Sequence, residues 1–271
     1  MSELRIALCQ IRVSSDKREN LERVLRTLEE VDVDLLVFPE YLMGMVNGRL
    51  SKNYVNLVSE TIEGEFITSI VDKSKETGAS LVFTVFLREE NRVYNASLLV
   101  EQGSLRAIYK KIHLFDAFGY RESSLFASGS DVVVCNFRGF KVGLAICFDL
   151  RFPELFRIMA YRGANLFIVP SAWYRGVYKV HQWYALTSCR AHENTAWLIA
   201  VDQIGEEFIG HSLVASPMGY IYADLGERER VCEVEIALDE VEEARRLVPV
   251  LELAKKEFYR KHYEQLTITY K

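Results

Sequence analysis

Residues 143–154 read GLAICFDLRFPE and place Cys147 between an apolar strand and a helix that begins with a proline. Residues Lys141–Ile146 alternate and then run apolar, which is typical of a buried or half-buried strand. Pro153 suits the first turn of a helix, because its missing N–H would have no partner there. Backbone N–H groups at such a junction favour a thiolate, so Cys147 is a candidate nucleophile. The alternative is a small apolar residue that closes a core strand, since free cysteine is often buried.

The size and charge of the chain predict a folded protein without a nucleic-acid or membrane role. It has 271 residues, 49% of them hydrophobic, and no linker rich in proline or serine divides it. We expect a single domain over residues 1–250 and a C-terminal tail over 251–271 whose aromatic residues dock on a partner subunit. The net charge of -5 gives no sign of nucleic-acid binding. No apolar run approaches the about eighteen residues of a membrane span.

The cysteines point to a reducing compartment. The five cysteines are scattered, and no CxxC pair or Cys/His cluster has the spacing of a zinc site. We therefore expect free thiols, a cytoplasmic location and no metal. The N-terminal segment MSELRIALCQIRV lacks the basic start and long apolar run of a secretory signal, which agrees with that location.

The order of the expected elements predicts a layered α/β protein. Several strands are apolar throughout, and such strands need cover on both faces. We expect strands over 4–11, 35–39, 81–87, 93–101, 105–112, 141–146, 164–169, 196–201 and 231–236, a hairpin over 213–223, and helices over 15–31, 153–161 and 177–194. A further helical region ends near Gly78, and each half of the chain is expected to form one sheet.

Three charged residues lie where strands end or in a long loop. Glu40 ends the run LLVFPEY, at the carboxyl end of a buried strand, where α/β sites form. Lys110 and Lys111 are adjacent on a strand and point to opposite faces, so an inward Lys111 needs acidic neighbours. Glu122 lies in the loop 113–131. Each of these residues, taken alone, is more often solvated than catalytic.

Together with Cys147, these residues suit acyl transfer. A glutamate in a dry pocket has a raised pKa and can take the proton of a thiol. A lysine and the Phe148 backbone N–H can stabilise a tetrahedral oxyanion, and a second carboxylate can hold the lysine. No GxSxG elbow, P-loop or GxGxxG after a strand supports another chemistry. A papain-like Cys–His hydrolase, with His113 or His211 as base, stays open.

Several motifs, in this order, resemble those of the nitrilase, or carbon–nitrogen hydrolase, superfamily. They are FPEY around Glu40, YKKIHLF around Lys111, GYRESSLFASG around Glu122, GLAICFDLRFPE around Cys147, RAHEN at 190–194 and GHSLVASPMGYI at 210–221. The resemblance implies an αββα sandwich of two mixed β-sheets flanked by helices, usually paired into an αββααββα homodimer. It also implies a triad of Glu40, Lys111 and Cys147, with Glu122 as a fourth member. The family uses no metal or organic cofactor.

The C-terminal part, from Gly210 through RRLVPVLE, resembles the compact amidase branch of ω-amidases and amidases of deaminated glutathione. Those enzymes release ammonia from small linear amides that carry a carboxylate at the other end. On this resemblance the substrate's acyl group forms a thioester with Cys147, which water then hydrolyses. The expected partners are thus a small-molecule amide, water and a second copy of the chain.

The far end of the substrate needs a cation, and two arginines are candidates. Arg151 or Arg175 can clamp a carboxylate bidentately, although Arg151 can instead pair with Asp149 or Glu154. The other residues expected to touch the oxyanion or substrate are Phe148, Trp173, Tyr174 and Tyr41. The loop DAFGYRES lacks the proline–glycine of many ω-amidases, so the exact substrate stays open. An N-carbamoyl amidase is the closest alternative, followed by a nitrilase and a non-catalytic member of the family.

Overall fold

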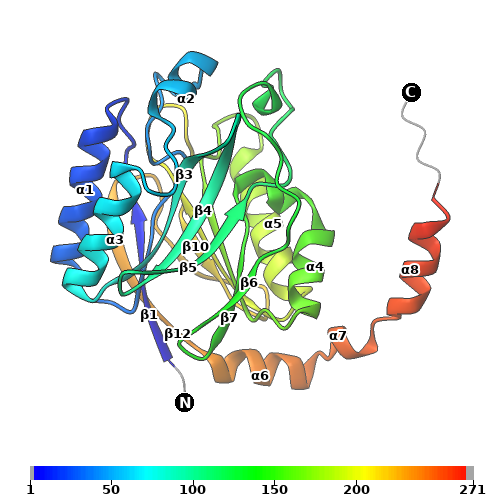
Figure 1. The fold of residues 1–271 in the computed structure, drawn as a ribbon. Coiled ribbons are helices and arrows are strands. Elements are labelled where there is room, and N and C mark those ends of the chain that lie inside the picture. Colours follow the sequence, from blue (N-terminus) through cyan, green and yellow to red (C-terminus); the bar gives the residue numbers. More distant parts are fainter. Residues whose placement is uncertain (1–2, 267–271) are drawn as a thin grey trace.

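Two six-stranded sheets packed face to face form the centre of the computed structural model, which describes residues 3–266 (Figure 1). The strands are β1 (Glu3–Gln10), β2 (Leu35–Val37), β3 (Ser80–Glu89), β4 (Arg92–Glu101), β5 (Ser104–Lys110), β6 (Val134–Phe137), β7 (Phe140–Leu144), β8 (Leu166–Ser171), β9 (Trp197–Asp202), β10 (Leu213–Ala215), β11 (Ile221–Asp224) and β12 (Arg230–Ala237). The first sheet has the order β12-β1-β2-β3-β4-β5, and the second has the order β11-β10-β9-β8-β7-β6. Both are mixed, with parallel strands at their centres.

Helices connect the strands of both sheets and follow the last strand. They are α1 (Lys17–Glu30), α2 (Lys52–Val58), α3 (Glu65–Thr77), α4 (Pro153–Tyr161), α5 (Lys179–His192), α6 (Leu238–Leu247), α7 (Val250–Leu253) and α8 (Lys256–Glu264), with short 3₁₀ turns η1 (Glu122–Ser124) and η2 (Cys147–Arg151). Helices α1 and α3 pack on the first sheet, and α4 and α5 pack on the second (Figure 1). This arrangement confirms the predicted αββα sandwich.

Strand β1 shows how alternation divides side chains between two cores. Leu4, Ile6 and Leu8 pack in the core between the sheets, whereas Ala7 and Cys9 pack in the core beneath α1 and α3. All five side chains are fully buried. A strand covered on both faces has no polar side, which is why these strands appear as apolar runs in the sequence.

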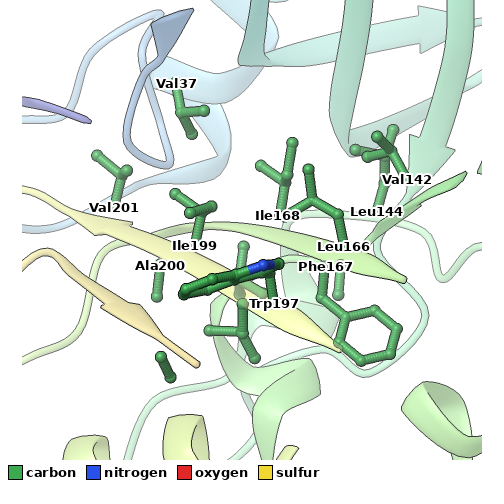
Figure 2. Packing of buried hydrophobic residues seen from close by; sticks show 14 of the residues in the cluster. Val37, Val142, Leu144, Leu166, Phe167, Ile168, Trp197, Ile199, Ala200 and Val201 are labelled. Carbon is green, nitrogen blue, oxygen red and sulfur yellow. The ribbon is translucent and has the colours of Figure 1, made fainter. Parts of the chain in front are cut away.

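The core between the sheets joins strands that are far apart in the chain. Val37 of β2 reaches toward Ile168 of β8 and Ile199 of β9 (Figure 2). Phe167 points away from Val37, and its ring meets the ring of Phe156 in α4 edge-on, with 5.2 Å between centroids (Figure 2). Each sheet therefore packs on the other sheet with one face and on its helices with the other.

Strand β12 corrects the expectation that each half of the chain forms one sheet. It lies in the C-terminal half but pairs antiparallel with β1 in the first sheet, where Ile236 lies opposite Leu4. The indole N–H of Trp197 in the second sheet donates to the carbonyl of Ala237 at 2.9 Å. The end of β12 thereby links the two sheets. Its alternating pattern predicted a strand but contained no information on its partner.

The C-terminal segment leaves the body of the molecule after α6. Helices α7 and α8 project away from the sandwich (Figure 1), and Phe258, Tyr259 and Tyr263 are 57%, 49% and 59% exposed. Residues 267–271 of the predicted tail lie outside the described residues. Within 3–266, no helix has both the length and the apolar character needed to cross a membrane.

Candidate active site

Strands of both sheets end at one edge of the sandwich, and the candidate residues follow those ends. Lys111 comes directly after β5, Glu40 comes shortly after β2, and Cys147 comes shortly after β7. The Glu40 backbone N–H donates to the carbonyl of Ser171, at the end of β8, at 3.1 Å and so joins the two sheets. A small pocket opens there, lined by Glu40, Tyr41, Lys111, Phe115, Cys147, Phe148, Arg151, Ala172, Trp173, Tyr174 and Lys179.

Lys111 lies between two carboxylates at the bottom of this pocket. Its side chain is 1% exposed, and its Nζ lies 2.8 Å from Glu40 Oε1 and 2.9 Å from Glu122 Oε2. Burial disfavours the charge, but the carboxylates of Glu122 and Glu40 outweigh it and hold the pKa of the Lys111 ammonium well above its usual value. Lys110 points to the surface and pairs with Glu89. Lys111 is thus the inward member of the pair, with the acidic neighbours that its burial requires.

The carboxylate of Glu40 is held by neutral donors as well as by Lys111. Oε1 accepts from Asn95 Nδ2 at 2.7 Å, and Oε2 accepts from the Ala172 backbone N–H at 2.9 Å. The Gln203 side chain donates to the backbone carbonyl of Glu40 at 2.7 Å. Burial raises the pKa of Glu40, the Lys111 charge partly offsets this, and the Glu122 charge adds to it. A fixed carboxylate with a raised pKa is suited to general base work.

Glu122 holds Lys111 from the opposite side. Its Oε1 accepts from the Tyr41 hydroxyl and from Asn95 Nδ2, both at 3.0 Å. Its Oε2 accepts from the Phe115 backbone N–H at 2.6 Å. Because Asn95 bridges both carboxylates, Glu40, Lys111 and Glu122 form one hydrogen-bonded unit. The long loop 113–131 therefore contributes a fully buried acid to the site.

Cys147 opens the turn η2 in a strained backbone conformation. Its φ is 45°, in the left-handed region that residues other than glycine rarely adopt. Asp149, two residues on, is fully buried and accepts from the Ile146 backbone N–H at 2.9 Å and from the Tyr109 hydroxyl at 2.7 Å. The same carboxylate accepts from the His113 backbone N–H at 3.1 Å. These bonds fix the turn that presents the sulfur to the pocket.

The surroundings of Cys147 favour the thiol over the thiolate. Burial and the Glu40 charge raise its pKa well above the usual value, and Lys111 and the Ala172 backbone N–H only partly offset them. This corrects the expectation of a thiolate at the strand–helix junction. The junction has the predicted shape, but loss of solvent and a nearby carboxylate outweigh the N–H groups. The sulfur must lose its proton as it reacts.

The mouth of the pocket combines aromatic rings with two cations. Phe148, Trp173, Tyr174 and Tyr41 line it as expected. The guanidinium of Arg151 lies 4.8 Å from the Trp173 ring and donates to Gln182 Oε1 at 2.8 Å, rather than pairing with Asp149 or Glu154.

Arg175 does not line the pocket. Its guanidinium pairs with Glu227 at 3.0 Å, outside the residues that face Cys147. Of the two arginines proposed as carboxylate clamps, the structure brings only Arg151 to the site. The loop after β8 turns there, so that Trp173 and Tyr174 face inward while the next side chain faces out.

Three residues of the pocket wall, Phe115, Ala172 and Lys179, were not candidates on the sequence alone. Phe115 follows the Lys111 motif in a loop without periodicity, and Lys179 begins α5. A lysine at the start of a helix is usually solvated, whereas Lys179 is 8% exposed. Only the docking of α5 beside η2 creates this burial, so no local pattern could have revealed it.

The two histidines of the papain-like alternative face other partners. His113 Nδ1 lies 2.7 Å from Asp149 Oδ1, and its ring stacks on Phe152. His211 Nδ1 lies 2.8 Å from the Tyr184 hydroxyl. Neither histidine lines the pocket of Cys147, so this alternative has no geometric support.

Comparison with known proteins gives the same family as the motifs. A family model described as carbon-nitrogen hydrolase matches residues 5–246. The chain is 31% identical to the deaminated glutathione amidase of Escherichia coli O157:H7, covering 91% of this chain and 95% of that one. It is 30% identical to the omega-amidase NIT2 of Mus musculus, with 96% and 98% covered.

Solved structures share the fold. A superfamily member from Xanthomonas campestris, with an arsenic adduct in its active site, superposes with a TM-score of 0.85 at 26% identity, covering 94% of this chain and 98% of that one. Nit3 of Saccharomyces cerevisiae gives 0.81 at 26% identity, with 94% and 97% covered. The chain therefore belongs to the carbon–nitrogen hydrolase family, as its motifs predict.

Proposed function

We propose that this protein is an amidase that releases ammonia from small linear amides carrying a carboxylate at the far end. The observation that carries the proposal is the buried unit of Glu40, Lys111 and Glu122, which shares one pocket with the thiol of Cys147. Relatives named deaminated glutathione amidase and omega-amidase support the choice of an amide over a nitrile.

In the first half-reaction, the sulfur of Cys147 attacks the amide carbon while Glu40 accepts the thiol proton. The raised pKa of Glu40 suits this transfer, because the acceptor must compete with a thiol whose own pKa is raised. The oxyanion forms beside the Lys111 ammonium and the Phe148 backbone N–H. Glu40 then gives the proton to the leaving nitrogen, so that ammonia departs and a thioester remains.

In the second half-reaction, water replaces ammonia. Glu40 takes a proton from the water, whose oxygen attacks the thioester carbon. The oxyanion collapses, the carbon–sulfur bond breaks, and the sulfur regains the proton. Glu122 touches no reacting atom in this scheme. It keeps Lys111 charged and in place, with Tyr41 and Asn95 holding its carboxylate.

At the far end, Arg151 binds the substrate's carboxylate. Its guanidinium lines the pocket, and its single polar partner among the described residues is the neutral side chain of Gln182. A guanidinium without a carboxylate partner is available for a bidentate pair. An N-carbamoyl amidase has the same needs, so products distinguish the two reactions.

A screen for ammonia release across ω-amides, N-carbamoyl compounds and nitriles tests the proposal. We expect the ω-amides to be hydrolysed fastest, and carbon dioxide release would instead indicate the carbamoyl reaction. Cys147→Ala should abolish turnover, whereas Cys189→Ala, which removes an exposed thiol, should retain it. Mass spectrometry of acid-quenched enzyme should find the acyl adduct on Cys147. Full activity of Cys147→Ala would refute the mechanism.

We also propose that the protein is a cytoplasmic homodimer in which the tail docks on a second copy. The free state of all five cysteines supports the location. Helices α4 and α8 line a hollow that includes Ile158, Tyr161, Leu253, Tyr259 and Tyr263. Light scattering should give a dimer mass, and Tyr259→Glu should shift it toward the monomer. Tyr220→Glu, at another exposed tyrosine, is the matched control.

A further inference from the structure

Two cations share the mouth of the pocket, and neither has a carboxylate partner within residues 3–266. Arg151 and Lys179 both line the cavity that contains Cys147. They are close enough for the charge of Arg151 to lower the pKa of Lys179, after burial, which lowers it most. No Asp or Glu among residues 3–266 contributes to holding either charge. Unpaired cations of this kind are costly unless an anion joins them.

Lys179 is the more buried of the two. It is the first residue of α5 and is 8% exposed. Its ammonium lies 3.8 Å from the centre of the Phe118 ring and 5.6 Å from that of Trp173. It donates to no hydrogen-bond acceptor in the part of the chain that the structure describes, and a third ring, that of Phe115, lies 5.8 Å away. These rings stabilise a cation without using its hydrogen bonds, which stay available to a ligand.

The neighbouring backbone is built to hold Lys179 in this place. Tyr178, just before it, has a φ of 61°, a left-handed conformation that turns the chain into the helix. The indole N–H of Trp173 donates to the Lys179 carbonyl at 3.1 Å. The Lys179 backbone N–H also donates to the carbonyl of Gly176 at 3.2 Å, so both backbone groups of Lys179 are held.

Arg151 is the second cation at the mouth of the pocket. Its Nη2 donates to Gln182, which lies in the first turn of the same helix α5. Its Nε is buried and has no partner among the described residues. Both cations are thus held through α5. The Lys179 ammonium and Arg151 Nε both have N–H groups that donate to no acceptor among the described residues.

We propose that Lys179 is a specificity-determining residue. Together with Arg151 it binds the far carboxylate of the amide and rejects amides that carry an ammonium group beside that carboxylate. The assignment rests on the proposed function in one respect: it takes from it that the amide end of the substrate reacts with Cys147. A carboxylate between two cations relieves their mutual repulsion, whereas an α-ammonium adds a third positive charge to a desolvated pocket. The pocket therefore prefers acids without an amino group.

Three amides of similar length isolate this effect. Glutaramate carries the carboxylate, glutamine adds the α-ammonium, and pentanamide has a methyl group instead of the carboxylate. Wild-type enzyme should prefer glutaramate to both. In Lys179→Met, kcat/KM for glutaramate should fall by about 10–100-fold, the value of one charge-assisted hydrogen bond. The rate on pentanamide should stay within about twofold, because that substrate makes no ionic contact.

The preference for glutaramate over glutamine should shrink in the same variant, because one of the two repelling cations is gone. Lys179→Arg should restore most of the activity, since it returns the charge. Lys52→Met is the matched control, because Lys52 is also the first residue of a helix but is exposed and lies outside the pocket. Equal losses on glutaramate and pentanamide, or no loss on glutaramate, would overturn the assignment.

A binding measurement separates this inference from the proposed function. Calorimetric titration with pentanoate, a monocarboxylate of the same length, needs no turnover and brings no second carboxylate beside Glu40. We expect Lys179→Met to bind pentanoate about 10–100-fold more weakly than wild type, with a melting temperature no lower than that of wild type. If wild type hydrolyses no amide but shows this difference in affinity, the proposed function is refuted and the carboxylate-binding site is supported. If wild type hydrolyses amides but the difference in affinity is absent, the binding site is refuted and the proposed function is supported.

Discussion

Replacing Lys111 with methionine is the sharpest test of the buried charge unit. Methionine has a similar length, so the packing volume is kept while the ammonium is lost. Glu40 and Glu122, both fully buried, then face each other with no cation between them. Both keep Asn95 as a shared donor, within 2.7 Å of Glu40 and 3.0 Å of Glu122.

The expected loss of stability in Lys111→Met depends on the hydrogen bonds that Glu40 and Glu122 keep. Removing one partner of a buried ion pair costs about 3–5 kcal/mol, because the other charge stays buried. Here the backbone N–H groups of Ala172 and Phe115 still bind one oxygen of each carboxylate, which places Lys111→Met near the lower end. The melting temperature should fall by about 6–20 °C for this range in a chain of this size.

The loss of stability in Lys111→Met should also depend on pH. Burial already raises the pKa of Glu40 above its unfolded value, and loss of Lys111 raises it further. The folded state then binds a proton more tightly than the unfolded state, which stabilises the fold at low pH, and this stabilisation is lost as pH rises through the folded pKa. The deficit of Lys111→Met relative to wild type should therefore be larger near about pH 8 than near about pH 5.

Urea unfolding of both proteins at the two pH values measures this deficit, with Lys110→Met as the matched control on the surface. In the double variant Lys111→Met/Glu122→Gln, one of the two unpaired carboxylates is neutral, so it should recover part of the loss. A deficit below about 1 kcal/mol that is the same at both pH values would refute the reasoning, since it would mean that the two carboxylates are not coupled to Lys111.

Two further predictions concern the nucleophile. Glu40→Gln should lower amide turnover by about 10²–10⁴-fold, which is the usual contribution of a general base. Iodoacetamide should nevertheless alkylate Cys147 faster in this variant, because the Glu40 charge that raises the thiol pKa is gone while Lys111 remains. Slower alkylation would contradict this prediction. Asp149→Ala leaves the backbone N–H groups of Ile146 and His113 and the Tyr109 hydroxyl without their buried acceptor, so the free energy of unfolding should fall by about 1–3 kcal/mol and kcat should fall with it. Unchanged kcat despite a lower free energy of unfolding would show that the turn holds Cys147 without Asp149.

The candidate residues Glu40, Lys111 and Cys147 could be selected from the sequence because each lies at or just past the end of an expected strand. Strand ends alone did not join them: the chemistry that they could share and the order of the family motifs did. The raised pKa of Cys147 was not predictable, because it depends on burial and on the Glu40 carboxylate from the other sheet. The partner of β12 was likewise set by long-range pairing with β1.

The residues of the pocket wall were harder to predict, because their positions depend on contacts between distant parts of the chain. Arg175 and Lys179 are four residues apart and look alike in the sequence as basic residues near aromatic ones. In the structure, Arg175 pairs with Glu227 outside the pocket, whereas the start of α5 brings Lys179 into it. A loop conformation decides between them, and hydrophobic periodicity carries no information about loops.

The distribution of charge in the pocket connects the proposed chemistry with the proposed specificity. Glu40 and Glu122 outnumber Lys111 at the inner end, while Arg151 and Lys179 are both positive at the mouth. A linear substrate with one anionic end can enter in only one orientation, carboxylate toward the mouth and neutral amide toward Cys147. An anionic group at the inner end would be repelled by Glu122 and by Glu40, whose charge also raises the pKa of the Cys147 thiol. The charge of Glu40 that disfavours ionisation of the sulfur therefore also helps to select the bond that the sulfur attacks.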